Sequence, residues 1–276
     1  MSPAIIAIVL AAALLHAVWN AMVKGAVDRT VMLGLISLGH VIPGLALVAL
    51  APAPALTALP YMIASTMIHW AYYFFLNAGY RTGDLSLVYP VARGLAPVMI
   101  ALGAVIWADE YLPFLAWTGI LTVSAGILML VFRSQGAQGG ALGAALATSA
   151  MIAAYSIVDG IGIRVSGSPL GYIGWLFVAE ISVVAFVIAL RRRAVGTMGQ
   201  RALMLGFAGG VLSGLAYGLV LYAKTLAPLG IVSALRETSV IFAALIGVIW
   251  MGEGPVTRRL IAAAVVAFGI IVLSVA

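Results

Sequence analysis

Ten apolar stretches of about twenty residues each, separated by short loops, dominate this sequence. At a rise of ~1.5 Å per residue, each stretch is about as long as the ~30 Å hydrocarbon core of a bilayer is thick. The chain is therefore predicted to be an all-α membrane protein with ten transmembrane helices. The predicted spans are roughly 3–23, 31–50, 61–80, 85–107, 112–132, 141–163, 169–190, 202–222, 229–251 and 256–275.

Composition excludes a water-soluble fold. Hydrophobic residues make up 64% of the chain and charged residues 8%, against roughly 45–50% and 25% in a typical globular protein. The chain has no cysteine and three histidines, and we expect neither a metal site nor a cofactor. The net charge of +6 comes from residues between apolar runs, which favours the lipid bilayer as partner over nucleic acid.

Prolines support the predicted helix starts independently of hydropathy. A proline in the first turn of a helix removes no hydrogen bond, because the N–H groups of that turn have no partner within the helix. Six prolines occupy such positions: Pro3, Pro60, Pro113, Pro169, Pro228 and Pro255.

The loops differ strongly in positive charge, and this difference predicts the orientation of the chain. One alternating set of loops carries only Arg164 and Lys224. The other set carries Lys24, Arg29, Arg81, Arg133, Arg191, Arg192, Arg193, Arg201, Arg258 and Arg259. Because cytoplasmic loops carry the excess of Lys and Arg, the second set is placed in the cytoplasm. With ten spans, both termini are then predicted on the periplasmic side of a bacterial inner membrane.

An internal repeat divides the chain in two. A shift of 143 residues aligns 93–110 with 236–253 without gaps and gives seven identities in eighteen positions, among them Trp107/Trp250 and Glu110/Glu253, against roughly two expected by chance. The repeats are predicted at about 1–138 and 139–276, with five spans each. An odd number of spans inverts the second copy, and such repeats are typical of secondary transporters with a substrate site between them.

Three segments carry a family resemblance that covers essentially the whole chain: LLHAVWNAMVKGA, LSLVYPVARGLAPVMIALGAVIWADEYLPFLAWTGILTVSAGILML and IVSALRETSVIFAALIGVIWMGEGPVTRRLIAAAVVAFGIIVLSV. They resemble the EamA-type ten-helix members of the drug/metabolite transporter superfamily. Among these the chain is most similar to exporters of the YddG type. The resemblance implies export of aromatic amino acids and of related amphipathic compounds.

Two arginines are predicted deep in the membrane. Arg93 and Arg236 each lie roughly 13 Å into their spans from opposite faces, so the repeat should bring them toward one central region. A guanidinium group there can hold a carboxylate through two parallel hydrogen bonds. The alternative, given equal weight, is that each arginine ties helices together through acids or backbone carbonyls.

Three acids also lie within predicted spans, where an ionised carboxylate needs a partner. Glu180 or Glu237 could carry a proton or bind the ammonium group of a substrate. We favour the alternative that one of them forms a salt bridge with Arg93 or Arg236. Asp159 is equivalent to His16 under the 143-residue shift, so both are candidates for lining the cavity from opposite repeats.

Rings and hydrogen-bonding groups recur at helical spacing in the third span. His69, Tyr73 and Asn77 follow one another at intervals of four, which predicts one polar, aromatic face lining a cavity. For the histidines His16, His40 and His69, helix packing is the favoured alternative. The complete candidate substrate-binding set is Arg93, Arg236, His16, Trp19, Asn20, His69, Tyr73, Asn77, Tyr89, Tyr155 and Tyr217.

Irregular backbone is expected in the fourth span. Pro90 and Pro97 bracket Gly94, so this helix loses backbone hydrogen bonds on both sides of Arg93 and should bend there as a hinge. The eighth span instead carries a glycine every four residues, which predicts close packing with a neighbouring helix, with sliding or dimerisation as alternatives. These glycines are Gly206, Gly210, Gly214 and Gly218.

Motifs exclude several function classes. No G-x-x-x-x-G-K-[ST] sequence is present, so this chain has no nucleotide-hydrolysing domain. No H-E-x-x-H or G-x-S-x-G sequence is present either, and we expect no enzyme activity. The repeat and these exclusions predict a secondary transporter that works by alternating access, and the family resemblance implies that it exports amino acids, aromatic ones in particular. Alternatives are a carrier of neutral aliphatic amino acids or sugar phosphates, an intramembrane enzyme and a passive pore; a monomer is expected, with a homodimer as the alternative.

Overall fold

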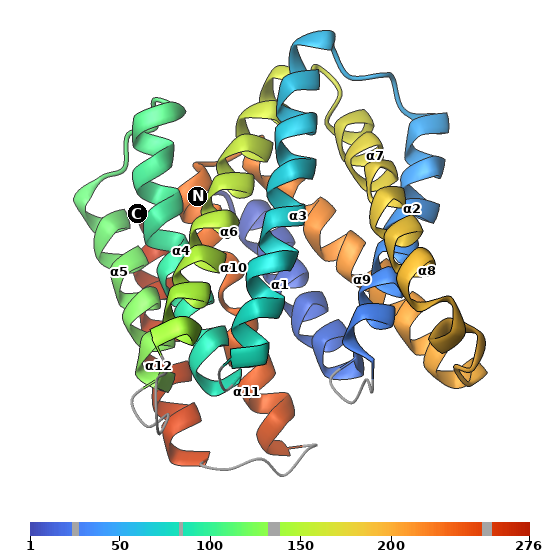
Figure 1. Ribbon diagram of the computed structural model, residues 1–276. Coiled ribbons are helices and arrows are strands. Elements are labelled where there is room, and N and C mark those ends of the chain that lie inside the picture. The colour runs from blue at the N-terminus through green and yellow to red at the C-terminus, as the bar shows by residue number, and fades with distance from the viewer. Residues whose placement is uncertain (24–27, 83–84, 132–138, 250–255) are drawn as a thin grey trace.

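The computed structural model describes residues 1–23, 28–82, 85–131, 139–249 and 256–276, and their regular structure is entirely helical (Figure 1). The sequence analysis also used Lys24, Arg133, Trp250, Glu253 and Pro255, which lie outside the described residues.

The first half of the chain forms five long helices. They are α1 (Pro3–Val23), α2 (Arg29–Leu50), α3 (Leu59–Thr82), α4 (Leu85–Trp107) and α5 (Phe114–Leu128), with the short 3-10 turns η1 (Leu56–Ala58) before α3 and η2 (Met129–Val131) after α5. The second half comprises α6 (Gly139–Val165), α7 (Pro169–Ala179), α8 (Ile181–Gly196), α9 (Gln200–Lys224), α10 (Leu229–Arg236), α11 (Ser239–Ile249) and α12 (Val256–Ser274). Because α7 continues into α8 and α10 into α11, the described helices make ten long segments at the predicted positions. The all-helical prediction is confirmed.

The helix α3 differs from the other segments in its polarity. Among the described helices, nine segments have the length and apolar composition of a membrane span. With 24 residues α3 is long enough to be the tenth, but its histidine, tyrosine, asparagine and arginine side chains lower its hydropathy. A polar helix in such a bundle is stable when its polar face points away from lipid, and α3 packs along α6.

Two segments of the second half are interrupted, and neither interruption is at a proline. Glu180 separates α7 from α8, and Glu237 and Thr238 separate α10 from α11. At both places the glutamate N–H donates to a carbonyl three residues back, Phe177 O and Ala234 O, as in a tightened last helical turn. In contrast, α4 continues as one helix through its two prolines. Both interruptions lie away from the prolines beside which irregular backbone is expected from the sequence.

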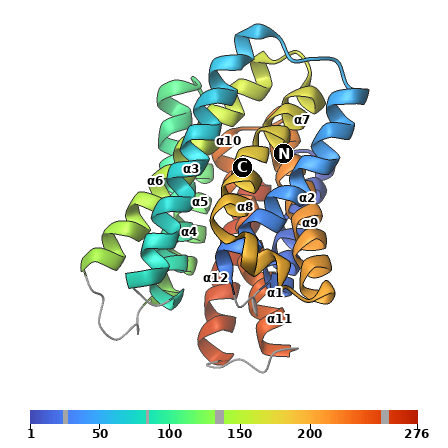
Figure 2. The same cartoon turned by 45° about the vertical axis from the view of Figure 1, so that its right-hand side comes forward.

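Helix packing has the symmetry of the repeat. The helix α3 packs along α6, and α1 packs along α9; exchanging the two repeats turns the first contact into the second. The helix α5 packs on α12, α2 on α7 and α8, and α4 on α10, so each of these pairs exchanges with itself. The two views of the bundle show segments from both halves side by side throughout (Figures 1 and 2). This arrangement fits an inverted repeat whose halves meet over most of their length.

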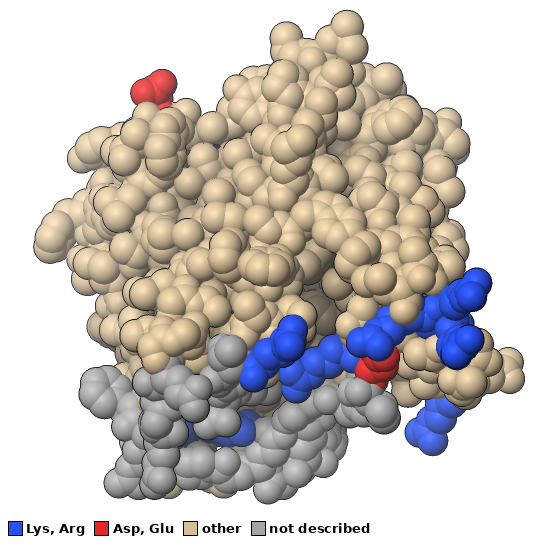
Figure 3. All heavy atoms as spheres, viewed as in Figure 1, with Lys and Arg blue, Asp and Glu red and all other residues tan. Residues whose placement is uncertain are grey.

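Basic side chains gather at one end of the molecule. In Figure 3 the visible Lys and Arg side chains lie along the lower edge, and both chain ends marked in Figure 1 lie away from that edge. Exposed members of the predicted cytoplasmic set include Arg29, Arg81, Arg192, Arg193 and Arg201. Lys224, from the opposite set, was treated as a loop charge but is fully buried at the end of α9.

The glycine pattern of α9 faces α2. A Cβ atom at Gly39 of α2 would lie 2.6 Å from the backbone of Gly210 in α9, and a Cβ atom at Gly210 would meet the carbonyl oxygen of Ile36. The two helices therefore touch backbone to backbone. Since backbone atoms cannot rotate away as a side chain does, larger residues there would force the helices apart.

We predict that Gly39→Ala lowers the stability of the protein by about 1–3 kcal/mol, because the added methyl group overpacks this contact. Gly143→Ala is the matched control: it also lies in a helix, has nothing near its Cβ position, and should be neutral or stabilising by up to ~1 kcal/mol. Thermal unfolding of both variants in detergent measures the difference. Equal midpoints for the two variants would contradict the close contact.

Candidate functional site

Six aromatic side chains from four segments form one cluster inside the bundle. The central cluster consists of His69, Tyr72, Tyr73, Tyr155, Phe177 and Tyr217. His69 stacks on Tyr155 with ring centroids 4.3 Å apart, and Tyr217 lies 6.0 Å from both rings. The third-span face thus meets rings from α6, α7 and α9. Such a cluster offers flat apolar surface with polar edges to a ligand that contains a ring.

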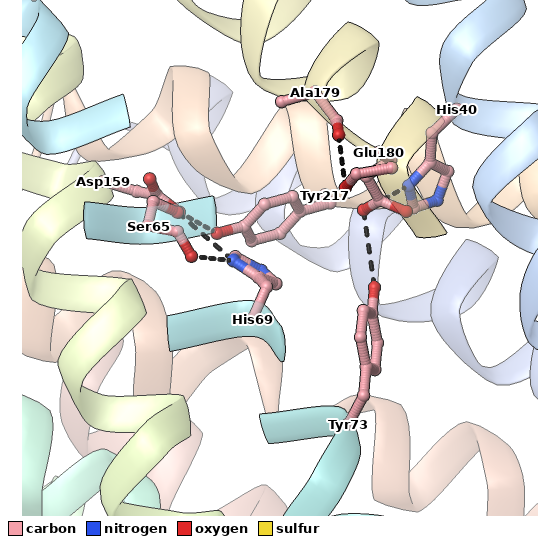
Figure 4. Close-up of polar contacts among 9 residues, drawn as sticks. His40, Ser65, His69, Tyr73, Asp159, Ala179, Glu180 and Tyr217 are labelled. Carbon is pink, nitrogen blue, oxygen red and sulfur yellow. Dashed lines mark hydrogen bonds and ion pairs between the residues drawn. The ribbon is translucent and has the colours of Figure 1, made fainter. Parts of the chain in front are cut away.

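A hollow opens beside the central cluster. It lies between α3, the α7–α8 junction and α9. Its lining residues are Thr66, His69, Trp70, Tyr73, Leu176, Phe177, Ala179, Glu180, Ser182, Val183 and Tyr217. We refer to it as the Glu180 hollow, after the acid in its wall. Figure 4 shows Tyr217 extending between Glu180 and Asp159.

Glu180 has a histidine partner. His40 Nδ1 lies 3.0 Å from Glu180 Oε1, and the hydroxyl of Tyr73 donates a long hydrogen bond of 3.5 Å to the same oxygen (Figure 4). The favoured sequence-based interpretation gave Glu180 or Glu237 an arginine partner. The structure places Glu180 with His40, so of these two acids only Glu237 has that role.

Arg93 is neutralised by Glu237. Its Nε lies 3.1 Å from Oε2 and its Nη2 lies 2.9 Å from Oε1. Both side chains are buried, with 8% and 5% of their surface exposed. The Nε contact is a charge-assisted hydrogen bond, and the Nη2 contact adds a second close approach of opposite charges. Arg93 therefore ties α4 to the α10–α11 junction, as the structural alternative for this arginine describes.

Arg236 lies in a different setting from its repeat partner. It is partly buried, and its guanidinium carbon lies 5.9 Å from the ring centroid of Tyr217. Among the described residues, the ion pairs of the structure do not include Arg236.

Asp159 accepts hydrogen bonds from two tyrosines of the bundle. The hydroxyl groups of Tyr172 and Tyr217 donate to its two carboxylate oxygens, the first over 3.0 Å. Asp159 and the nearby Lys224 are both fully buried, and Lys224 Nζ donates to Ser156 O over 2.9 Å. This network fixes the hydroxyl end of Tyr217 and so positions its ring between Arg236 and the Glu180 hollow.

The remaining predicted residues lie outside the central cluster. Trp19 Nε1 donates to His16 Nδ1 over 3.3 Å, and Asn20 donates to the carbonyl of His16, so this face of α1 bonds largely within itself. Tyr89 is half-buried in the electrostatic field of the Arg93–Glu237 pair. Asn77 is exposed. Eight residues at ~100° each rotate it about 80° from His69, which takes it off the face that meets the cluster.

Glu110 is a polar contact residue that was not among the candidates predicted from the sequence. Glu110, used there only as a mark of the repeat, forms an ion pair of 2.7 Å with Arg164. Its carboxylate also accepts the backbone N–H of Leu229 at the start of α10, where a negative charge is favourable. Arg164 in turn donates to the carbonyl oxygens of Lys224 and Ala227. The sequence signal for this role was that a glutamate, Glu110 or Glu253, directly follows the corresponding span in each repeat.

The ion pairs of the described residues share one property. Each of the four joins a residue before 138 to a residue after 139: Arg93–Glu237, His40–Glu180, Glu110–Arg164 and Asp28–Arg191. The last pair is looser, at 3.9 Å, and more exposed. Charge pairing therefore holds the two halves of the bundle to each other.

Comparison with known proteins finds a family match in the second half of the chain. Residues 139–275 match the EamA-like transporter family. This part of the sequence is similar to members of that family. A solved crystal structure aligns with 100% of this chain and 98% of its own, with a TM-score of 0.81 and 19% sequence identity; at this identity the likeness concerns the fold. None of the curated protein sequences matches the chain.

The matched region contains α6 to α12, including Glu180, Arg236, Glu237 and Tyr217. Its similarity to a transporter family and the described apolar helices of membrane-spanning length fit a membrane transporter of small molecules. The partners of these residues in the first half of the chain are Arg93, His40 and Tyr73.

We predict that Arg93→Gln destabilises the protein by roughly 3–5 kcal/mol, because it leaves the buried Glu237 carboxylate without its counter-charge. The double variant Arg93→Gln/Glu237→Gln should lose less than the sum of the two single variants. Denaturation of all four proteins in mixed micelles completes the cycle. Strictly additive losses would show that the two side chains do not interact.

Proposed function

We propose that the protein is a secondary transporter that exports amino acids, aromatic ones in particular, and related amphipathic metabolites by alternating access. The observation that carries the proposal is the position of Arg236. A guanidinium group without a carboxylate partner among the described residues lies against Tyr217 at the edge of the central cluster. A membrane protein gains little from such a charge unless a ligand uses it.

The chemistry of an aromatic amino acid fits these two features together. Its carboxylate can accept two parallel hydrogen bonds from Arg236. Its ring can pack against the central cluster by edge-to-face or offset contacts, each worth roughly 0.5–1.5 kcal/mol. Arg93 is less suited to the same task, because Glu237 already neutralises its charge. The proposal thus moves the carboxylate site to one arginine of the two that the sequence suggested.

The two repeats suggest how such a ligand would cross the membrane. The segment α10, which ends at Arg236, is followed by a backbone interruption, and interrupted helices beside a central site are typical of secondary transporters. We infer that the halves rock about the site, with the ion pairs that join them changing during the cycle. The hinge expected at Pro90, Gly94 and Pro97 lies in the helix that faces this interruption.

The proposal predicts saturable uptake of radiolabelled phenylalanine by proteoliposomes that contain the purified protein. Arg236→Gln should lower uptake at subsaturating substrate roughly 10- to 100-fold, because hydrogen bonds to a charged group contribute about 1.5–3 kcal/mol. Arg201→Gln removes an exposed arginine at the start of α9, more than four helical turns before Tyr217. This variant is the control and should show unchanged uptake.

Three outcomes distinguish the alternatives. Normal uptake by a folded Arg236→Gln variant would contradict the carboxylate site. Uptake of threonine or of a sugar phosphate in place of phenylalanine would keep transport and change the substrate. Flux that never saturates with concentration would favour a passive pore.

The gathering of basic side chains at one end supports the proposed orientation, with both termini in the periplasm of a bacterial cell. Accordingly, a C-terminal alkaline phosphatase fusion should be active, and a C-terminal green fluorescent protein fusion should stay dark, because that protein fluoresces only when it folds in the cytoplasm. A bright fusion in intact cells would reverse the orientation. The same two fusions at the N-terminus test on which side of the membrane the other chain end lies.

A further inference from the structure

The Glu180 hollow has an electrostatic character that differs from the Arg236 site. A carboxylate forms part of its wall, and its described lining includes no lysine or arginine. His40 Nδ1 lies 3.0 Å from Glu180 Oε1 and pairs with that oxygen. A carboxylate in an apolar wall is stabilised further by each additional donor or cation that approaches it.

The hydrogen bonds of Glu180 leave capacity for a further donor. Oε1 is bound by His40 and, more weakly, by Tyr73. Oε2 makes no hydrogen bond among the described residues. An ionised carboxylate accepts about four hydrogen bonds, so a protonated amine with its three donors would find acceptor sites here.

Aromatic rings line the rest of the hollow. Trp70, Tyr73, Phe177 and Tyr217 contribute to its walls, and Trp70 is held by a hydrogen bond of 3.2 Å from its Nε1 to Ser182. Faces of tryptophan and tyrosine attract ammonium groups, with contributions of about 0.5–2 kcal/mol depending on solvation.

The hollow and Arg236 lie along the same tyrosine at different places. Tyr217 lines the hollow, while Arg236 lies 5.9 Å from its ring centroid and is absent from the residues that line the hollow. An amine that has no carboxylate can offer Arg236 no acceptor. Such a ligand would need only the contacts of the Glu180 hollow.

We propose that the Glu180 hollow binds protonated organic amines, so that the protein takes arylalkylamines as a second class of ligand, independent of the carboxylate site at Arg236. Glu180 supplies the counter-charge, the rings of Trp70, Tyr73 and Tyr217 enclose the ammonium group and its chain, and the central cluster accepts the aromatic end. His40 positions the carboxylate.

Calorimetric titration of the purified protein in detergent with phenethylamine tests this proposal, with phenethyl alcohol as its uncharged counterpart. The wild type should bind the amine at least tenfold more tightly than the alcohol. Glu180→Gln should remove this preference, and Glu180→Asp, which keeps the charge on a shorter side chain, should retain part of it. Asp109→Asn is the control, because Asp109 is an exposed acid outside the hollow.

Two results would overturn the proposal: equal affinities of the wild type for the amine and the alcohol, or an unchanged amine affinity in a Glu180→Gln variant that elutes as a monodisperse species. Arg236→Gln should leave the affinity for phenethylamine within twofold, and a larger loss would contradict the independence of the two sites. Failure of phenylalanine uptake alongside Glu180-dependent amine binding would refute the proposed amino-acid export and leave this inference standing.

Discussion

Charges buried in a medium of low dielectric must find partners, and in this protein they find them across the boundary between the two repeats. Arg93 with Glu237, His40 with Glu180 and Glu110 with Arg164 each draw one member from either half. Apolar side chains give little preference for one helix contact over another within lipid. The ion pairs therefore specify how the halves are arranged, and the helices that carry them are fixed in register.

The need of a buried charge for a partner also distinguishes the two sites proposed for ligands. Arg93 and Arg236 correspond in sequence, but only the first has an acid beside it. Glu180 has a partner that is charged only when protonated. The two proposed sites, at Arg236 and beside Glu180, both adjoin Tyr217, whose hydroxyl group donates a hydrogen bond to Asp159.

Much of the fold follows from local patterns in the sequence, and much of the site does not. Apolar length and first-turn prolines predicted the bounds of α4 and α1 as they are found, because the bilayer sets helix length. The breaks at Glu180 and Glu237 have no local signal, since their partners His40 and Arg93 lie 140 and 144 residues away in sequence. Helical spacing correctly brought His69 and Tyr73 together, but a 3.6-residue period carries Asn77 off that face.

The repeat is also imperfect at an informative position. Shifting Glu237 by 143 residues leads to Gly94, so the first half has no acid where the second half has one. A motion that exchanges the roles of the halves would trade a neutralised Arg93 for an Arg236 that faces glycine. In the proposed cycle, the empty protein would then have unequal free energies in its two end states, and its resting population would be biased toward one side of the membrane. A cargo that brings its own carboxylate to Arg236 would reduce this difference, so that loading would make the two states more equal in population.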